Sequence, residues 1–276
     1  MLTRSKLSLS IILIMVFLLA ISGNVMGQEY NDTFDKIKDE EVLTIGLAAS
    51  EPGAFFDVDT GEWNGFLVDA WKKLASDLEY DVEFVETSWD MFQISLQNEN
   101  FDFFGNHTFY TSARAKNVAY TTPLFYKGVG LVANKDDNRF KTIQDVKELS
   151  ENEEIIVGVR MGAVEEEIIP KNFPDVEIES YKTDTASEIA MAVKAKNVDL
   201  WAADEVMQHN FLKENEWAKS IGVVGAHPVG LVVRYEDQKL LSFLNEYIEY
   251  LRSSGELATY FDKYGQPIGT LYAPKY

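Results

Sequence analysis

Two charged side chains in this sequence have the chemistry and the setting to hold a small polar molecule. Arg114 ends the polar turn "TFYTSAR" and stands just before "TTPLFYKGVGLVANK", a segment expected to contain a strand. A guanidinium presents five donors in a planar fork, which matches a carboxylate in a way that lysine does not. Asp204 lies in "VDLWAADEV", at the C-terminal end of another expected strand. Ligands of open α/β sheets usually lie at this end of the strands.

Each of these residues also has a structural interpretation. Arg114 could be a surface arginine that pairs with one of the many acids of the chain. Asp204 could be the N-cap of the following helix, a position that aspartate fills well, and it could cap the helix and bind a ligand at the same time. The choice depends on the elements that position the two residues.

Strands and helices alternate along most of the chain, which predicts a parallel α/β sheet. "EEVLTIGLAAS" (40–50) is a β-branched apolar run that is typical of a strand. Within 65–80, apolar residues recur at helical spacing and predict an amphipathic helix. These residues are Leu67, Val68, Trp71, Leu74, Ala75 and Leu78. Further strands are expected at 81–87, 101–107, 153–162, 176–181 and 198–204.

The alternation starts again after residue 134, which indicates two α/β units of about 100 residues each. The Gly/Val-rich segments near 127–133 and 228–234 are expected to be extended and to cross between the units. Two helices, 239–254 and 256–264, are expected to close the chain.

The first 27 residues predict an export signal. Arg4 and Lys6 precede an uncharged run from Leu7 to Ile21, and small or polar residues follow. The run is shorter than the roughly 20 residues that span a bilayer comfortably. We therefore expect the signal to be cleaved, with a retained membrane anchor as the alternative. The mature protein is expected in the periplasm or outside the cell.

Composition excludes several kinds of site. The chain has no cysteine, which rules out disulfides, cysteine metal sites and thiol nucleophiles. His107, His209 and His227 show no ligand-like spacing, so neither a metal nor a cofactor is expected. A formal net charge of −20 disfavours binding to nucleic acid and to anionic membrane surfaces.

Five stretches, taken together and in order, resemble the bacterial extracellular solute-binding proteins of family 3, which serve ABC transporters of polar amino acids. They are "GFLVDAWKKLA", "WDMFQISLQNENFDFF", "TSARAKNVAYTTPLFYKGVGLVANK", "VDLWAADEV" and "VGLVVRYEDQKLLSFLNEYIEYLRSSGELATYFDKYG". The resemblance extends from about residue 40 to 266. It implies the periplasmic-binding-protein type 2 fold. In that α/β fold, two lobes, each a mixed and mainly parallel sheet flanked by helices, are joined by two crossing strands and close on a ligand.

The resemblance also implies a division of the chain. Residues 1–27 would be the signal peptide. Residues 28–127 and 231–276 would form a discontinuous first lobe, and residues 128–230 would form the second lobe.

The resemblance gives the two charged residues opposite roles. In the family, the arginine at the place of Arg114 binds the α-carboxylate of the ligand, and the acid at the place of Asp204 receives the α-ammonium. A guanidinium from one lobe and a carboxylate from the other would then hold a zwitterion between them. Only a molecule with both charges would bridge the lobes, so closure would depend on the ligand.

Further ligand contacts follow from the same resemblance. Trp89 stands where the family has an aromatic that covers the ligand side chain, although a core aromatic is an equal alternative. Glu51 follows the first strand and could favour a cationic side chain, or could simply be an exposed acid. Phe109, Ala163 and Val164 replace the hydroxyl residues of the family. Backbone N–H groups at a helix start would then hold the anion, and the pocket would be more apolar.

An exported dehydratase acting on prephenate-like or arogenate-like cyclohexadienols is the enzyme alternative. A few proteins of this fold use a glutamate shortly after the glycine that opens a helix of the second lobe, and Glu165 can be aligned with it. Such an acid protonates a leaving hydroxyl and needs burial to raise its pKa. The run "EEE" at 165–167 is instead typical of a solvated first helical turn. We therefore expect Glu165 to be solvated and the protein not to be an enzyme.

These observations predict a monomeric receptor that captures a small zwitterion, an amino acid or an analogue, and delivers it to a membrane ABC permease. No nucleic-acid partner is expected. A ligand sensor without a transport role is a further alternative.

Overall fold

A mixed sheet organises the part of the chain that the computed structural model describes, residues 32–183 and 186–266. Its strand order is β4-β1-β5-β11-β7-β10-β8-β9, and β6 pairs with β11 as the ninth strand. The strands are β1 (Val42–Leu47), β4 (Asp81–Glu86), β5 (Phe103–Phe109), β6 (Ala119–Tyr120), β7 (Phe125–Asn134), β8 (Ile156–Arg160), β9 (Glu177–Tyr181), β10 (Leu200–Asp204) and β11 (Ala218–Val233). A small hairpin pairs β2 (Phe55–Asp57) with β3 (Glu62–Asn64). The predicted signal peptide lies outside the described residues.

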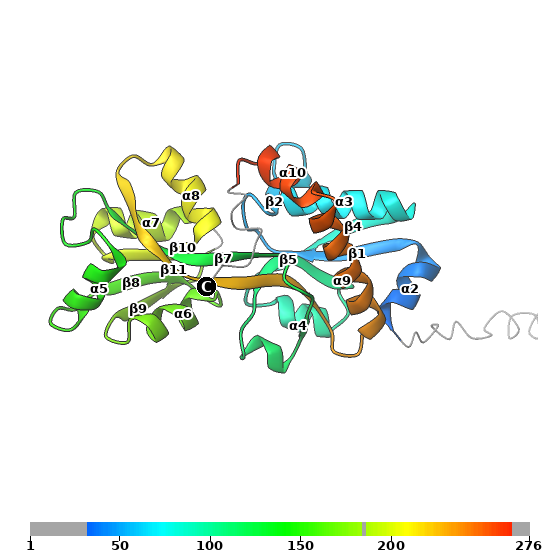
Figure 1. The fold of residues 1–276 in the computed structure, drawn as a ribbon, viewed down its shortest axis with the longest axis horizontal. Coiled ribbons are helices and arrows are strands. Elements are labelled where there is room, and N and C mark those ends of the chain that lie inside the picture. The colour runs from blue at the N-terminus through cyan, green and yellow to red at the C-terminus, as the bar shows by residue number, and fades with distance from the viewer. Residues whose placement is uncertain (1–31, 184–185, 267–276) are drawn as a thin grey trace, which may run out of the picture. The chain divides into compact units, whose positions relative to one another are not determined.

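The two ends of the sheet are parallel, and its middle is antiparallel. At one end β1 pairs in parallel with β4 and β5, and at the other end β8 pairs in parallel with β9 and β10. We call these ends, with their helices, the first and the second lobe (Figure 1). The first lobe carries α2 (Thr33–Glu40), α3 (Phe66–Leu78), α4 (Phe92–Gln97), α9 (Gln238–Ser253) and α10 (Glu256–Lys263). The second lobe carries α5 (Ile143–Ser150), α6 (Glu165–Asn172), α7 (Ala186–Ala195) and α8 (Glu205–Glu214).

Two long strands, β7 and β11, join the lobes. They pair with each other in antiparallel register from Ala218↔Asn134 to Val229↔Phe125, and β11 continues along β5. β11 begins well before the segment predicted at 228–234, because two register shifts interrupt the alternation that reveals a strand. The predicted lobe boundaries at 127/128 and 230/231 fall inside β7 and β11. Both strands therefore belong to both lobes, and the boundaries stay a prediction.

The helix predicted from apolar spacing is confirmed as α3. Leu67, Val68, Trp71 and Leu74 are buried there. The indole Nε1 of Trp71 donates to the carbonyl oxygen of Gly105 on β5 at 3.0 Å. A Cβ at Gly105 would lie only 2.9 Å from the Trp71 Nε1, so glycine is needed for the helix to pack this closely on the sheet.

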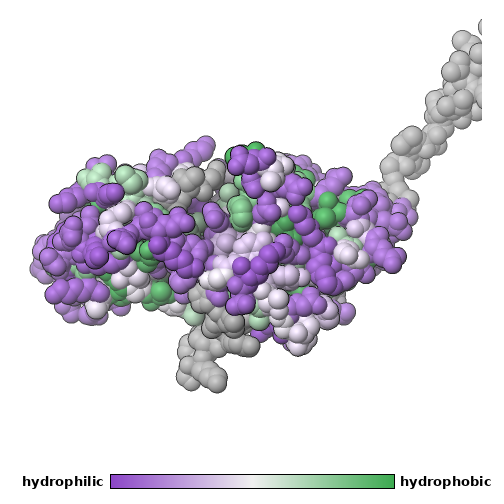
Figure 2. Space-filling view, turned by 90° about the horizontal axis from the view of Figure 1, so that it is seen from above, coloured by the Kyte–Doolittle hydropathy of each residue, from purple (hydrophilic) through white to green (hydrophobic). Residues whose placement is uncertain are grey.

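Apolar side chains are largely confined to the interior. The face seen in Figure 2 is mostly hydrophilic, with small scattered apolar patches. Of the described helices, none is long and apolar enough to cross a membrane.

Arg234 fastens the start of the described chain to its closing helices. Its Nη1 donates to the carbonyl oxygen of Leu96 at 2.8 Å, and its Nε lies 2.8 Å from Asp237 Oδ2. Asp237 Oδ1 in turn accepts the backbone N–H of Thr33 in α2 at 2.9 Å. All of these groups are buried, so the ion pair between Arg234 and Asp237 lies in a region that excludes water.

We predict that Arg234→Met lowers the free energy of unfolding by about 3–5 kcal/mol, because Asp237 stays buried without its counter-charge. Arg139→Met is the matched control. Its side chain is 41% exposed and pairs with Asp137 and Asp199 at the surface, so its loss should be about 1 kcal/mol or less. Urea unfolding followed by circular dichroism measures both values. Equal losses in the two variants would contradict this role of Arg234.

Candidate functional site

Arg114 is a buried cation that reaches from one lobe to the other. It begins a short 3₁₀ turn, η1 (Arg114–Lys116), and its side chain turns inward so that only 7% of the residue is exposed. Nη2 donates to the carbonyl oxygen of Gly162 in the second lobe at 2.9 Å, and Nη1 donates to that of Phe109 at 3.4 Å. It makes no ion pair with a carboxylate of the described residues. The surface-arginine interpretation is therefore wrong.

Asp204 ends β10 and caps α8, as its structural interpretation predicted. Its Oδ1 accepts the backbone N–H groups of Val206 and Met207, each at 3.0 Å. Its Oδ2 lies 3.2 Å from the Nζ of Lys127, and the two side chains are only 6% and 2% exposed. Burial alone would raise the pKa of Asp204, but the charge of Lys127 and further partners lower it to about 2. Asp204 is therefore an ionised carboxylate with both oxygens engaged.

Sequence reasoning missed Lys127, the cation that neutralises Asp204. It lies on β7, where it is the one charged residue between Phe125 and Asn134. A lysine inside a largely apolar strand is the signal that could have identified it. Burial lowers its pKa, although the nearby Asp204 carboxylate opposes this effect. Its Nζ lies 4.7 Å from the ring centre of Phe109, within the range of a cation–π contact.

Six of the seven predicted ligand-binding residues line one small cavity between the lobes. Its walls are Trp89, Phe109, Arg114, Lys127, Arg160, Ala163, Val164, Glu165 and Asp204, and its volume is about 10 Å³. That volume corresponds to about one water molecule. The side chains therefore fill most of this part of the space between the lobes, and their role in ligand binding stays a proposal.

Trp89 is at the same time a core aromatic and a wall of the cavity. Its ring packs edge-on against Phe104 with centroids 5.6 Å apart. It also lies 6.0 Å from the guanidinium carbon of Arg114 and 5.4 Å from that of Arg160. The interpretation of Trp89 as a core aromatic is therefore confirmed, and its contact with a ligand side chain stays a prediction.

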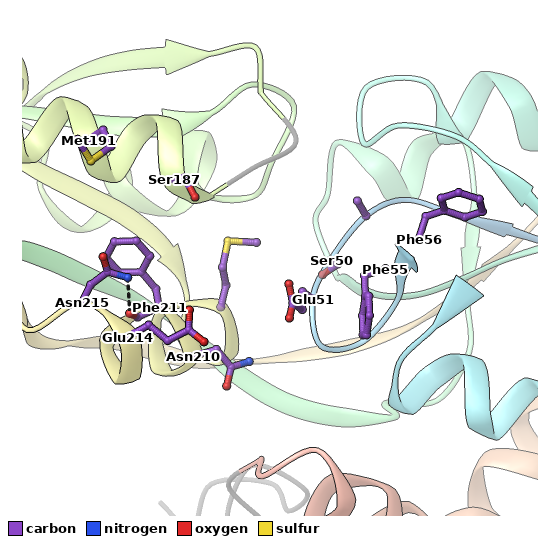
Figure 3. Close-up of a pocket in the computed structure, with 12 residues that line it drawn as sticks. Ser50, Glu51, Phe55, Phe56, Ser187, Met191, Asn210, Phe211, Glu214 and Asn215 are labelled. Carbon is purple, nitrogen blue, oxygen red and sulfur yellow. Dashed lines mark hydrogen bonds between the residues drawn. The ribbon is translucent and has the colours of Figure 1, made fainter. Parts of the chain in front are cut away.

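Glu51 is the predicted residue that the structure does not bring to the small cavity. It lines a separate, larger pocket of about 560 Å³. Figure 3 shows this pocket between the loop carrying Ser50, Glu51 and Phe55 and the helices carrying Met191 and Phe211. Met207 lines this pocket and also a cleft of about 10 Å³ that reaches Arg160 and Glu165.

The start of α6 offers fewer free donors than predicted. Ala163 and Val164 are buried beside the cavity. The N–H of Ala163 already donates to the carbonyl oxygen of Arg160 at 3.1 Å, and that of Gly162 donates to Glu166 Oε2 at 2.9 Å. The carboxylate of Glu166 and the carbonyl oxygen of Arg160 therefore already accept two of the N–H groups expected to hold an anion here.

The expectation that Glu165 is solvated is wrong. The residue is 3% exposed, because α6 begins against the cleft and its first residue packs inward while Glu166 and Glu167 stay half-exposed. Burial raises the pKa of Glu165, and the charge of Arg160 opposes that rise. Two buried atoms at this point have no hydrogen-bond partner, Glu165 Oε2 and Arg160 Nε. Within residues 32–183 and 186–266, no group of acids and histidines could hold a metal ion.

Comparisons with known proteins agree with this architecture. The family model described as bacterial extracellular solute-binding proteins, family 3, matches residues 43–267. The L-cystine-binding protein TcyJ of Escherichia coli (strain K12) is 24% identical over 235 residues, which cover 83% of this chain and 85% of that protein.

Two solved structures are similar over most of the chain. One is AncCDT-1, described as an ancestral amino acid-binding protein and a precursor of cyclohexadienyl dehydratase, with a TM-score of 0.74, 26% identity, and coverage of 84% of this chain and 99% of that one. The other is the arginine-bound form of a truncated ArgBP from T. maritima, with a TM-score of 0.68, 28% identity, and coverage of 79% and 99%.

The pKa of Asp204 leads to a prediction about acid stability. Its folded-state value of about 2 lies below the ordinary 3.8, so the carboxylate adds stability that is fully present above pH 4 and is lost as the pH falls towards 2. Asp204→Asn keeps an oxygen for the helix cap but removes this titration. The difference in unfolding free energy between wild type and variant should shrink by about 2 kcal/mol over that range. Urea unfolding at stepped pH measures it, and a constant difference would refute the assignment.

Proposed function

This chain belongs to family 3 of the bacterial extracellular solute-binding proteins and has their periplasmic-binding-protein type 2 fold, and on that premise we propose that it captures an amino acid or a close analogue between its lobes and delivers it to an ABC permease. Arg114 is the observation that carries the proposal. It is buried, lines a cavity shared by both lobes, and donates hydrogen bonds to two carbonyl oxygens.

A ligand carboxylate would improve the environment of Arg114. Carbonyl oxygens are neutral acceptors, whereas a carboxylate forms shorter, charge-assisted bonds and can accept two parallel donors from one guanidinium. A buried cation without a counter-charge is costly. A bound carboxylate would therefore supply the negative charge that Arg114 lacks. Because Arg114 also contacts Gly162 of the second lobe, a ligand bound there would lie between the two lobes.

Ligand entry would require the lobes to separate. The cavity of about 10 Å³ has room for about one water molecule, far less than an amino acid needs. Domain closure around a ligand by hinge motion is a common transition, and β7 and β11 are the segments that would bend.

The names of similar proteins support the amino-acid class without selecting a member of it. TcyJ is described as L-cystine-binding and the T. maritima protein as arginine-bound. Another relative from Escherichia coli is described as an ABC transporter arginine-binding protein, which supports the proposed permease partner. Export by a cleaved signal and a monomeric state are part of the same proposal, and sensing without transport is its alternative.

The structure supports only one end of the zwitterionic clasp. At the Arg114 end, the guanidinium lacks a counter-charge. At the Asp204 end, the carboxylate already forms an ion pair with Lys127. An incoming ammonium would have to displace or share with that lysine.

One observation favours a second function, a dehydratase that acts on cyclohexadienols. Glu165 is buried and its pKa is raised, as a general acid requires, and AncCDT-1 is described as a precursor of such an enzyme. The nearby charges of Arg160 and Lys127 oppose this rise in pKa without cancelling it, but the relatives TcyJ and the T. maritima ArgBP are described as binding proteins. We therefore keep the binding function as the primary proposal.

We predict that Arg114→Met weakens binding by about tenfold or more, because one partner of a desolvated charge pair is lost. Arg114→Lys should also bind poorly, since lysine keeps the charge but loses the planar fork. A thermal-shift screen of amino acids and their carboxylic-acid analogues would first identify a ligand, and titration calorimetry would then compare the variants. Arg139→Met, at the surface, is the control. Wild-type affinity in Arg114→Met would remove this residue from the site.

For the dehydratase alternative, we predict that the wild-type protein forms no phenylpyruvate from prephenate and no phenylalanine from arogenate. Chromatography of the reaction mixture measures both products, with a protein-free incubation correcting for spontaneous decay. Product that appears with wild type and disappears with Glu165→Gln would show that the protein is an enzyme.

A further inference from the structure

Asp204 faces the cavity, but both of its oxygens already have partners in the protein. Oδ1 accepts two backbone N–H groups of α8, and Oδ2 pairs with Lys127. The pair is deeply buried, so both charges have lost their water. An arriving ammonium would find a carboxylate that is already neutralised and a lysine that repels it.

Basic side chains outnumber acidic ones around the cavity. Arg114, Lys127 and Arg160 face only Asp204 and Glu165. Once Lys127 and Asp204 are paired, two guanidiniums remain against one carboxyl group whose burial favours its neutral form. An additional cation is unfavourable in such a place, whereas an anion is favoured.

Two buried atoms beside the cavity have no hydrogen-bond partner, and an oxygen-bearing ligand could satisfy both. Arg160 Nε is a buried donor without an acceptor, and Glu165 Oε2 is a buried oxygen without a partner. Such groups are rare in native structures and call for an explanation. Both residues line the cavity beside Arg114. Arg160 needs an oxygen, and a protonated Glu165 would donate to one as well.

We propose that the ligand is a small organic acid without an ammonium group. Its carboxylate binds Arg114, and a second oxygen-bearing group, such as a 2-hydroxyl, a 2-oxo group or another carboxylate, meets Arg160 and Glu165. Lys127 supplies from within the protein the ammonium that Asp204 would otherwise receive from a ligand. This inference rests on the proposed function and specifies its ligand class.

The first test compares matched molecules that differ only at the α position. Calorimetric titration of wild type would use three sets: alanine, pyruvate and lactate; phenylalanine, phenylpyruvate and phenyllactate; glutamate, 2-oxoglutarate and 2-hydroxyglutarate. In the set whose side chain fits, the acids without an ammonium should bind about tenfold tighter or more than the amino acid, because the amino acid brings an unpaired cation.

The second test removes the internal ammonium. Lys127→Met frees Asp204, so the amino acid of the same set should gain about tenfold or more in affinity, reversing the preference. Lys263→Met, whose side chain is 61% exposed, is the matched control and should keep the wild-type preference. Because Lys127→Met leaves a buried charge unpaired, its folding is checked by circular dichroism. The double variant Lys127→Met/Asp204→Asn removes both charges and should retain the preference for acids.

The outcomes separate this inference from the function on which it rests. A wild type that binds an amino acid tighter than its matched acids, with no reversal in Lys127→Met, overturns the inference and leaves the receptor function intact. Amino-acid binding that falls in Glu165→Gln but persists in Asp204→Asn would place the ammonium at Glu165 and also overturn it. If no member of any set, nor cystine or arginine, binds wild type or Lys127→Met, the proposed function itself fails.

Discussion

The buried ion pair between Lys127 and Asp204 determines which charges between the lobes remain available to a ligand. Removing both charges from water is costly, and the cost is offset only by their mutual attraction and by the α8 backbone N–H groups that also bind Asp204. Asp204 lies opposite Val129 in the pairing of β10 with β7, so the register of two strands brings the charges together. The pair joins a strand shared by both lobes to the start of a helix in the second lobe.

With that pair neutral, the remaining charges define what the cleft can hold. Arg114 reaches across from the first lobe and donates hydrogen bonds to two carbonyl oxygens. Arg160 and Glu165 approach from the second lobe with unpartnered atoms. The ring of Trp89 lies against the guanidiniums of Arg114 and Arg160. Its apolar surface lowers the local dielectric, which strengthens the electrostatic interaction of each guanidinium with an anion.

Much of the fold and of the site could be predicted from the sequence, for physical reasons. The periodic spacing of apolar residues predicted α3, because Trp71 and its apolar neighbours repeat on one face of a helix. The alternation of strands and helices predicted the parallel ends of the sheet. The family resemblance led to Arg114, Asp204 and Trp89, which the structure brings around one cavity. Glu51 lines a different pocket, and its contact with a ligand stays a prediction, because the direction of a loop residue depends on tertiary packing.

The errors concern side chains whose surroundings come from distant parts of the chain. Glu165 belongs to a run of acids that looks solvated, and only the contact of α6 with the cleft buries it. Lys127 interrupts an apolar strand, and its partner Asp204 is far away in sequence. Neither spacing nor composition reveals such a pair, since it depends on which strands become neighbours.

The central claim is that Arg114 holds a ligand carboxylate inside the cleft. Native mass spectrometry of the protein purified without dialysis tests this most directly, followed by denaturation and identification of the released molecule. We predict a small carboxylate-bearing molecule bound to the wild type and absent from Arg114→Met. A released molecule without a carboxylate, or one that Arg114→Met retains equally well, would contradict the account.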